Sequence, residues 1–195
     1  MVEELGFGSE VFERLEREDE AIARRVAELG CPRCGGPLYR ADYERQPRGA
    51  LVAPAAEGSV RRHSLCCGRE GCRRRATPPS LRFLGRRLYV GAVVIAASMV
   101  ALALQRAGAI RAATGVPART TYRWLDWWRS AFVSTEVFVA VAARMVGVAI
   151  EFMPTSIVER LPGEKAERLE RLLEMLAPIT TASVVDGSRF LRTGS

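Results

Sequence analysis

Histidine and lysine are almost missing from this chain. Of its 195 residues, one is a histidine, His63, and one is a lysine, Lys165. With a single imidazole, and with no phosphate-binding loop or pair of catalytic carboxylates in the sequence, nothing indicates nucleophilic or acid–base catalysis. We therefore expect no enzymatic activity. The chain opens on Met-Val-Glu-Glu, without a basic start or a following apolar run, and so we expect no secretory signal.

Long apolar stretches are scarce as well. The mean hydropathy is +0.01, which excludes a protein with several membrane spans. One charge-free apolar run covers residues 88–104, at the short end of the length that a bilayer requires, about 17–25 residues. Alanine, glycine and serine dilute this run and favour close packing between helices. We expect a buried central helix here, with a single membrane span as the alternative.

The remaining composition is that of a globular protein. Hydrophobic residues make up 48% of the chain and charged residues 26%, which excludes a disordered or collagen-like chain. The length fits one domain or two small ones. The five cysteines are odd in number and clustered, which disfavours a disulfide framework and fits a reducing compartment. The expected location is the cytoplasm.

Charge is distributed unevenly along the chain. Residues 1–30 hold nine acids and four bases, whereas residues 31–132 hold eighteen bases and five acids. Nearly all of the bases are arginines, which a GC-rich genome would also produce. Their concentration in the middle of the chain nevertheless favours a surface for a polyanion, because arginine binds phosphate through two parallel hydrogen bonds.

The pattern of apolar residues predicts a mainly α protein with a small β-rich unit. The cysteine and glycine motifs at residues 31–72 make that unit a zinc ribbon, and the layout of residues 108–125 places a helix-turn-helix in the helical part. Helices are expected at residues 9–29, 84–105, 107–113, 118–131 and 163–177, and short strands at residues 37–43 and 60–65. Glu16, Glu18, Asp19 and Glu20 are expected on a solvated face of the first helix. Four segments follow from this pattern: an acidic helix (1–30), a four-cysteine ribbon (31–80), a helix-turn-helix domain (81–150) and an amphipathic helix with a tail (151–195).

The cysteine spacing predicts a structural zinc site. Cys31 and Cys34, followed by two glycines, have the spacing of a zinc knuckle, in which backbone N–H groups turn toward the thiolates. A second pair would come from Cys72 with either Cys67 or Cys66. We favour Cys67 for its shorter knuckle, and the remaining cysteine would then be a small core residue. A redox pair and unliganded core cysteines are the alternatives.

Arginines surround the second knuckle. Arg61 and Arg62 precede it, and Arg73, Arg74 and Arg75 follow it. We expect these five to contact DNA phosphates and His63, between the two groups, to face the surface or a phosphate. A solvated turn is the alternative.

Residues 108–125 have the layout of a helix-turn-helix. Ile110 and Ala113 would face inward, Gly115 would permit the turn, Val116 would fill the corner and Pro117 would start the second helix. That helix would present four residues to the major groove: Arg119, Thr120, Thr121 and Arg123. Trp124 and Trp128 are expected in the core.

The cysteine knuckles, the run Arg73–Arg75 and the stretch from Gly115 to Trp124 together resemble the DNA-binding half of insertion-sequence transposases. The resemblance covers about residues 31–132, with residues 77–87 read as a linker. It implies binding to the terminal repeats of a mobile element. The chain departs from the pattern because only Asp186, in a Val-Val-Asp-Gly context, could mimic one of the three carboxylates of a nuclease core, and a turn role suits it better.

Together these features predict a cytoplasmic, nucleoid-associated protein that binds double-stranded DNA at a specific sequence or repeat end, without a nuclease core. A homodimer would suit paired half-sites, and no small-molecule substrate or membrane contact is expected. The alternatives are a protein-interaction module stabilised by zinc and a protein anchored by one membrane span.

Overall fold

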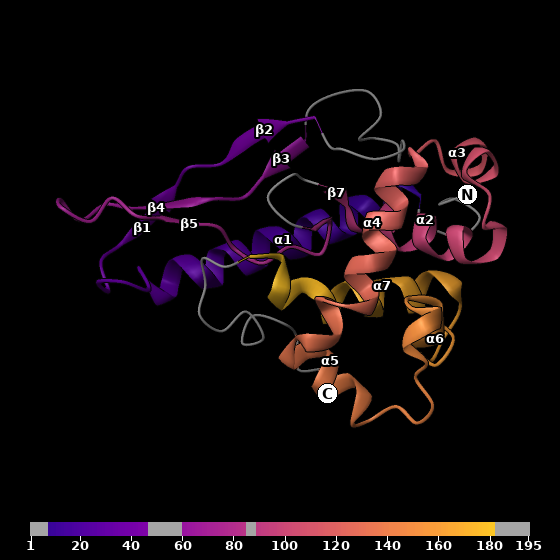
Figure 1. Cartoon of the computed structure of the whole chain (residues 1–195). Helices are drawn as coiled ribbons and strands as arrows, with labels where there is room; N and C mark the ends of the chain where they lie inside the picture. Colours follow the sequence, from indigo (N-terminus) through magenta and orange to yellow (C-terminus); the bar gives the residue numbers. More distant parts are fainter. Residues whose placement is uncertain (1–7, 47–59, 85–88, 182–195) are drawn as a thin grey trace.

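The computed structural model describes residues 8–46, 60–84 and 89–181. The β1–β4–β5 and β2–β3 sheets (strands between residues 38 and 76) lie toward one end of an elongated molecule and most of the helices toward the other, with the β6–β7 pair (residues 83–84 and 89–90) between them (Figure 1). Helix α1 (Ser9–Leu29) runs along both halves and connects them. The mainly helical fold with small sheets agrees with the prediction.

Helix α1 forms because apolar residues recur every three or four positions. Phe12, Leu15, Ile22 and Val26 are buried on one stripe, and Gly30, with φ of 78°, ends the helix. Asp19 lies on the same stripe and is fully buried, so the expectation of a solvated position is wrong for this residue.

Three two- or three-stranded sheets make up the β part. Strand β4 pairs with β1 on one side and β5 on the other, β2 pairs with β3, and β6 pairs with β7, all antiparallel. The bounds are β1 (Leu38–Arg40), β2 (Tyr43–Arg45), β3 (Val60–Arg62), β4 (Leu65–Cys67), β5 (Arg75–Ala76), β6 (Phe83–Leu84) and β7 (Tyr89–Val90). The expected strands 37–43 and 60–65 are each broken in two, at Ala41–Asp42 and at His63–Ser64.

The segment between the ribbon and the helices is not a linker. Residues 78–83 are buried, and Asp19 accepts hydrogen bonds there from the Ser80 hydroxyl (2.7 Å), the Leu81 N–H (2.7 Å) and the Arg82 Nε (3.0 Å). The Arg82 guanidinium lies over the rings of Phe12 and Phe83, at 5.4 and 5.0 Å from their centroids. This segment therefore ties α1 to the centre of the molecule.

Helix α2 (Gly91–Leu104) is the central helix, and residues 91–98 are buried without interruption. It packs against α3 (Ala107–Thr114), α4 (Ala118–Arg129) and α7 (Lys165–Leu176). The predicted helix over 84–105 is thus shorter, because β6 and β7 occupy its start. None of the helices in the described ranges is long and apolar enough to cross a membrane.

The C-terminal part closes the core from one side. Its short elements are η2 (Phe132–Ser134), α5 (Glu136–Ala142), η3 (Ile150–Phe152), α6 (Thr155–Val158) and η4 (Ala177–Thr180). Helix α7 buries the predicted leucine stripe, namely Leu169, Leu172, Leu173 and Leu176. A capping box between Glu164 and Glu167 starts this helix, and Arg14 of α1 pairs with Glu170. Apolar residues from all four sequence segments meet in one continuous core.

Candidate metal centre and basic surfaces

The first cysteine knuckle follows directly from the end of α1. After Gly30 the chain turns back on itself: the Gly35 N–H donates to the Cys31 carbonyl (2.8 Å) and the Cys31 N–H donates to the Gly36 carbonyl (2.8 Å). Gly35 has φ of 67°, a conformation that side chains resist. At Gly36 a Cβ would lie 3.3 Å from the sulfurs of both Cys34 and Cys67, so glycine keeps the space around these sulfurs open.

The second knuckle is the turn between β4 and β5. Cys67 ends β4, and Cys72 lies in the turn, where its N–H donates to the Arg69 carbonyl at 3.1 Å. The Cys67 N–H donates to the Arg74 carbonyl (2.9 Å), which closes the hairpin. The Gly68 N–H donates to the Pro37 carbonyl (2.9 Å), which joins the second knuckle to the first.

These two turns bring four sulfurs together. Cys31 and Cys72 lie 3.8 Å apart, Cys34 and Cys67 lie 3.6 Å apart, and all four ligand atoms lie within 4.8 Å of one another. A tetrahedral site with metal–sulfur bonds of about 2.3 Å separates its sulfurs by about 3.8 Å. The cluster therefore has the dimensions of a four-thiolate metal site, and all five cysteines are free of disulfide bonds.

The thiols of this cluster differ in acidity. The Arg33 backbone N–H, despite the opposing effect of burial, lowers the pKa of Cys31 to about 7. Burial raises the pKa of Cys67 to about 12, against the opposing effect of the Arg69 N–H. Backbone N–H groups thus point toward a sulfur in both knuckles, as the sequence predicted for the first.

The structure separates the two neighbouring cysteines as the strand pattern predicted. Cys67 belongs to the cluster, whereas the Cys66 sulfur lies on the other side of β4, 3.5 Å from the Arg73 carbonyl. Cys66 is only half-buried, so the expectation of a core residue is wrong.

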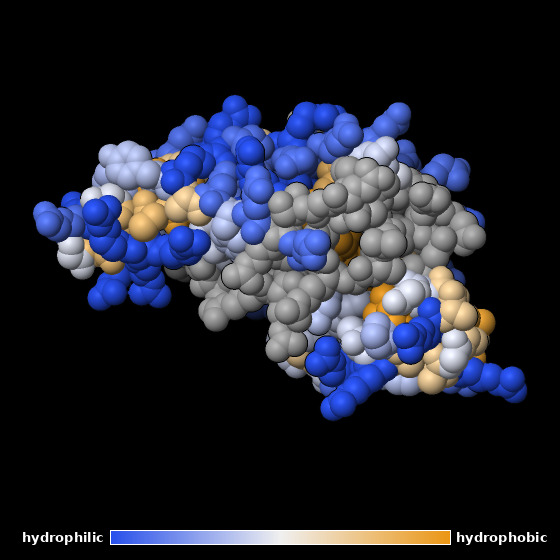
Figure 2. All heavy atoms as spheres, turned by 90° about the horizontal axis from the view of Figure 1, so that it is seen from above, coloured by the Kyte–Doolittle hydropathy of each residue, from blue (hydrophilic) through white to orange (hydrophobic). Residues whose placement is uncertain are grey.

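The arginines around the sheet divide into an exposed set and a buried exception. Arg61, Arg73, Arg74 and Arg75 are exposed, together with Arg33, which sequence reasoning did not select although it lies inside the first knuckle. Hydrophilic side chains gather at this end of the molecule, around a small apolar area, when it is seen from above (Figure 2).

Arg62 and His63 correct the prediction of a surface position, because each is only 2% exposed. The Arg62 guanidinium donates to the Pro78 carbonyl (2.7 Å), and burial lowers its pKa despite the opposing effect of Asp19. The His63 Nδ1 lies 3.2 Å from Asp42 and its Nε2 lies 3.6 Å from Glu20. Neither side chain is available to DNA phosphates in this conformation.

The turn between α3 and α4 leads into a second basic surface, which lies on α4. Gly115, with φ of 69°, makes the turn after α3, and Val116 is buried beneath it, as predicted. The Thr114 hydroxyl accepts a hydrogen bond from the Val116 N–H (3.1 Å). The sequence predicted that Ala113 would face inward, but Ala113 is exposed and Thr114 is the buried residue.

The first turns of α4 place the four predicted contact residues differently. Arg119 and Arg123 are exposed and Thr120 is half-buried, so these three can reach a partner. Thr121 is fully buried, which makes its expected DNA contact wrong. Trp124 and Trp128 are in the core, as expected, and Asp186 lies outside the described residues.

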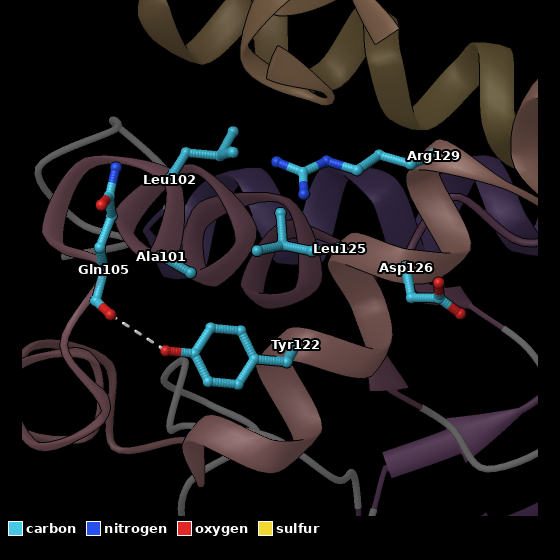
Figure 3. Close-up of a pocket in the computed structure, with 7 residues that line it drawn as sticks. All are labelled: Ala101, Leu102, Gln105, Tyr122, Leu125, Asp126 and Arg129. Atoms are coloured by element: carbon cyan, nitrogen blue, oxygen red, sulfur yellow. Dashed lines mark hydrogen bonds between the residues drawn. The ribbon is translucent and has the colours of Figure 1, made fainter. Parts of the chain in front are cut away.

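One pocket of about 400 Å³ lies between the end of α2 and α4. Figure 3 shows that the Tyr122 hydroxyl reaches across it to donate to the Gln105 carbonyl (3.2 Å). Arg129 extends along the opposite rim, and its guanidinium donates to the Glu151 carbonyl (2.6 Å). These two hydrogen bonds connect the pocket walls to each other and to η3.

No protein-family model, no curated protein and no solved structure matches this chain.

Proposed function

We propose that this protein binds double-stranded DNA at a specific sequence, with a zinc ribbon and a helix-turn-helix as its two contact units. The four-thiol cluster and the exposed arginines beside it support the ribbon. The turn between α3 and α4 supports the helix-turn-helix. Only this function uses both units, and it suits the basic charge of residues 31–132.

The metal would be Zn²⁺, since four sulfur ligands at tetrahedral spacing are typical of structural zinc. Cys31, Cys34, Cys67 and Cys72 would hold it. The ion would cross-link the end of α1 to the β4–β5 turn and so fix Arg73, Arg74 and Arg75 on a rigid frame. Metal analysis of the purified protein should give one zinc per chain, and iron would contradict this choice.

The observation that carries the DNA proposal is the division of α4 into two faces. Its inner face packs through Thr121, Leu125 and Trp128, all buried. Its outer face presents Arg119 and Arg123 one helical turn apart, near the N-terminal end that meets base edges in helix-turn-helix proteins. Arg119 would read a base or hold a phosphate, and Thr120 would assist it.

The proposed function is DNA binding without DNA cleavage, as in a transposase-like protein that lacks its nuclease core. Within the described residues, the cysteine cluster is the one grouping of side chains suited to hold a metal ion. The resemblance to transposases then concerns only the kind of DNA that is bound, which is a repeat end. It implies no DNA cleavage.

The test is to incubate zinc-loaded protein with fragmented genomic DNA and to sequence what it retains. We expect a recurring site, and Arg119→Ala should weaken binding to it by about 1–3 kcal/mol. The matched control is Arg171→Ala, because Arg171 is an exposed arginine on α7. Equal affinity of the Arg119→Ala variant and the wild type, on both the site and random DNA, would remove α4 as the reading helix.

A protein-interaction module stabilised by metal is the second candidate. Its support is that three large apolar side chains in the stretch from α5 to η3 are each exposed, Val139 at 62%, Val146 at 97% and Phe152 at 58%. Such side chains are typical of surfaces that meet another protein. A folded, zinc-loaded protein that retains no DNA in the same experiment would favour this candidate.

A further inference from the structure

The β1–β4–β5 sheet has an outward face that the duplex-binding proposal does not use. Tyr39 of β1 pairs with Cys66 of β4, which in turn pairs with Arg75 of β5. Residues directly opposite in an antiparallel ladder point to the same face. The neighbouring row, Leu38 with Cys67, faces the buried side. Tyr39, Cys66 and Arg75 therefore form one row on the solvent side.

Tyr39 is an exposed aromatic ring in a fixed position. It is 62% exposed, yet a Cβ built on Gly68 would lie only 2.2 Å from its Cε2 and 2.8 Å from its Cδ2. The Cδ2–Cε2 edge of the ring thus lies against the bare backbone of Gly68, and any other residue there would displace it. A ring placed by its edge, with most of its side chain exposed, offers a flat surface on which another flat group can stack.

The surroundings of this ring are strongly cationic. Residues 31–46 and 60–76 contain nine arginines and three acids. Arg73, Arg74 and Arg75 are exposed along the edge of the row, and the Arg75 guanidinium lies 6.0 Å from the Tyr43 ring centroid. An apolar ring among cations is complementary to a ligand that has both flat faces and negative charge.

Unpaired nucleotides have this chemistry. Single-strand-binding proteins combine aromatic rings, on which bases stack, with a basic groove along the backbone. In a duplex the base faces are covered by their neighbours, so paired DNA cannot use Tyr39 in this way. We propose that the row Tyr39–Cys66–Arg75 binds an unpaired strand of nucleic acid. One base stacks on Tyr39, and the adjoining phosphates contact Arg73, Arg74 and Arg75. This deepens the proposed function and rests on its basic sheet.

The experiment measures affinity of the zinc-loaded full chain for a blunt duplex, for the same duplex with a short single-stranded tail, and for the free single strand. Tyr39→Leu should weaken binding of the tailed duplex and the single strand about tenfold, the effect of losing one stacked base, and leave the blunt duplex unchanged. Tyr39→Phe should retain wild-type binding because it keeps the ring. Phe152→Leu is the matched control, an equally exposed ring on η3.

A second measurement does not depend on a variant at Tyr39. Cys66 lies beside Tyr39 in the row and outside the metal cluster. A base in the tail whose tether ends in an activated disulfide should exchange with the Cys66 thiol of the wild-type protein, which joins the tether to Cys66 and releases the small thiol leaving group. Cys66→Ser should abolish this cross-link. DNA and RNA tails are both tested, and a cross-link to either supports the proposal.

The outcomes separate the two proposals. Equal binding of tailed and blunt duplex, with no cross-link to Cys66, overturns the unpaired-strand proposal and leaves duplex binding intact. Binding of the free strand without binding of the blunt duplex supports the unpaired-strand proposal and overturns the duplex-binding function. Binding of neither overturns both.

Discussion

Among the described residues, Asp19 is a fully buried carboxylate that ties α1 to the segment leading into the central helix. Asp19 has no exposed surface and accepts hydrogen bonds from Ser80, Leu81 and Arg82, and Arg82 is itself only 1% exposed. Removing one partner of such a pair leaves a buried charge without compensation, which costs about 3–5 kcal/mol. We expect Asp19→Asn to lower the free energy of unfolding in urea by about this amount.

Glu13→Gln is the control for that measurement, since Glu13 is exposed on the same helix. It should change stability by less than about 0.5 kcal/mol. A similarly small effect of Asp19→Asn would show that the buried pair contributes little.

Asp19 also shows what sequence reasoning can and cannot find at the residue scale. The position lies four residues after Leu15 and three before Ile22, so helical spacing alone places it on the buried stripe. An acid at such a position indicates a buried partner. The identity of that partner, Arg82, depends on chain folding over 63 residues and leaves no local trace.

Asp42 should make stability depend on pH. Burial would raise the pKa of Asp42, but the Ser64 N–H (3.0 Å), His63 (3.2 Å) and Arg40 (3.3 Å) together hold that pKa below its ordinary value. Because the pKa of Asp42 in the folded state is lower than the ordinary value of about 3.9, its ionised carboxylate stabilises the folded protein at pH values above about 3.9. This stabilisation is lost as the pH falls through the pKa of the folded state.

The melting temperature of the wild type should therefore exceed that of Asp42→Asn at neutral pH, and the difference should shrink below about pH 4. Thermal unfolding followed at a series of pH values measures it. A difference that grows on acidification would contradict the assigned direction of the shift.

At the scale of elements, the turn between α3 and α4 depends on one backbone conformation. Gly115 has φ of 69°, a region that a Cβ disfavours. Gly115→Ala should destabilise the protein by about 1–2 kcal/mol. Gly108, inside α3, has ordinary φ and no heavy atom within 4 Å of a built Cβ, so Gly108→Ala should stabilise by about 0.5 kcal/mol. Unfolding in urea measures the change in the free energy of unfolding for both variants. If the two substitutions changed it in the same direction, this explanation of the Gly115 turn would be wrong.

Features that depend on neighbouring residues were predicted correctly from the sequence, whereas features that depend on contacts with distant parts of the chain were missed. The turn at Gly115 and the leucine stripe of α7 follow from spacing and glycine placement within a few residues. The shorter knuckle predicts Cys67 over Cys66, and strand alternation predicts that one of the two faces away; Cys67 is the one that lies in the cluster. Residues 78–83, in contrast, contain two prolines and an arginine, typical of a linker, and are buried by distant partners such as Asp19 and Thr180. Arg62 and His63 are also buried by non-local contacts, Arg62 with Pro78 and His63 with Asp42 and Glu20.

At the scale of the whole molecule, the metal cluster should stabilise one end and leave the other folded without it. The four sulfurs lie at the sheet end, whereas α2, α4 and α7 pack together at the other end, and the Asp19–Arg82 pair holds α1 there (Figure 1). Removing zinc with a chelator should therefore keep most of the helical circular dichroism signal while amides in β1, β4 and β5 exchange faster.

The same treatment should change DNA binding in a measurable way. If Arg73, Arg74 and Arg75 each contact a phosphate from a frame fixed by the metal, losing that frame should reduce the slope of log K against log salt by up to about 2.7, at about 0.9 for each contact. Cys67→Ser should reproduce both effects and release the metal. Cys66→Ser, the change at the adjacent position, should keep one metal per chain and the full slope. Release of the metal by Cys66→Ser, or an unchanged slope after chelation, would separate the cluster from the basic surface and leave α4 as the main contact with DNA.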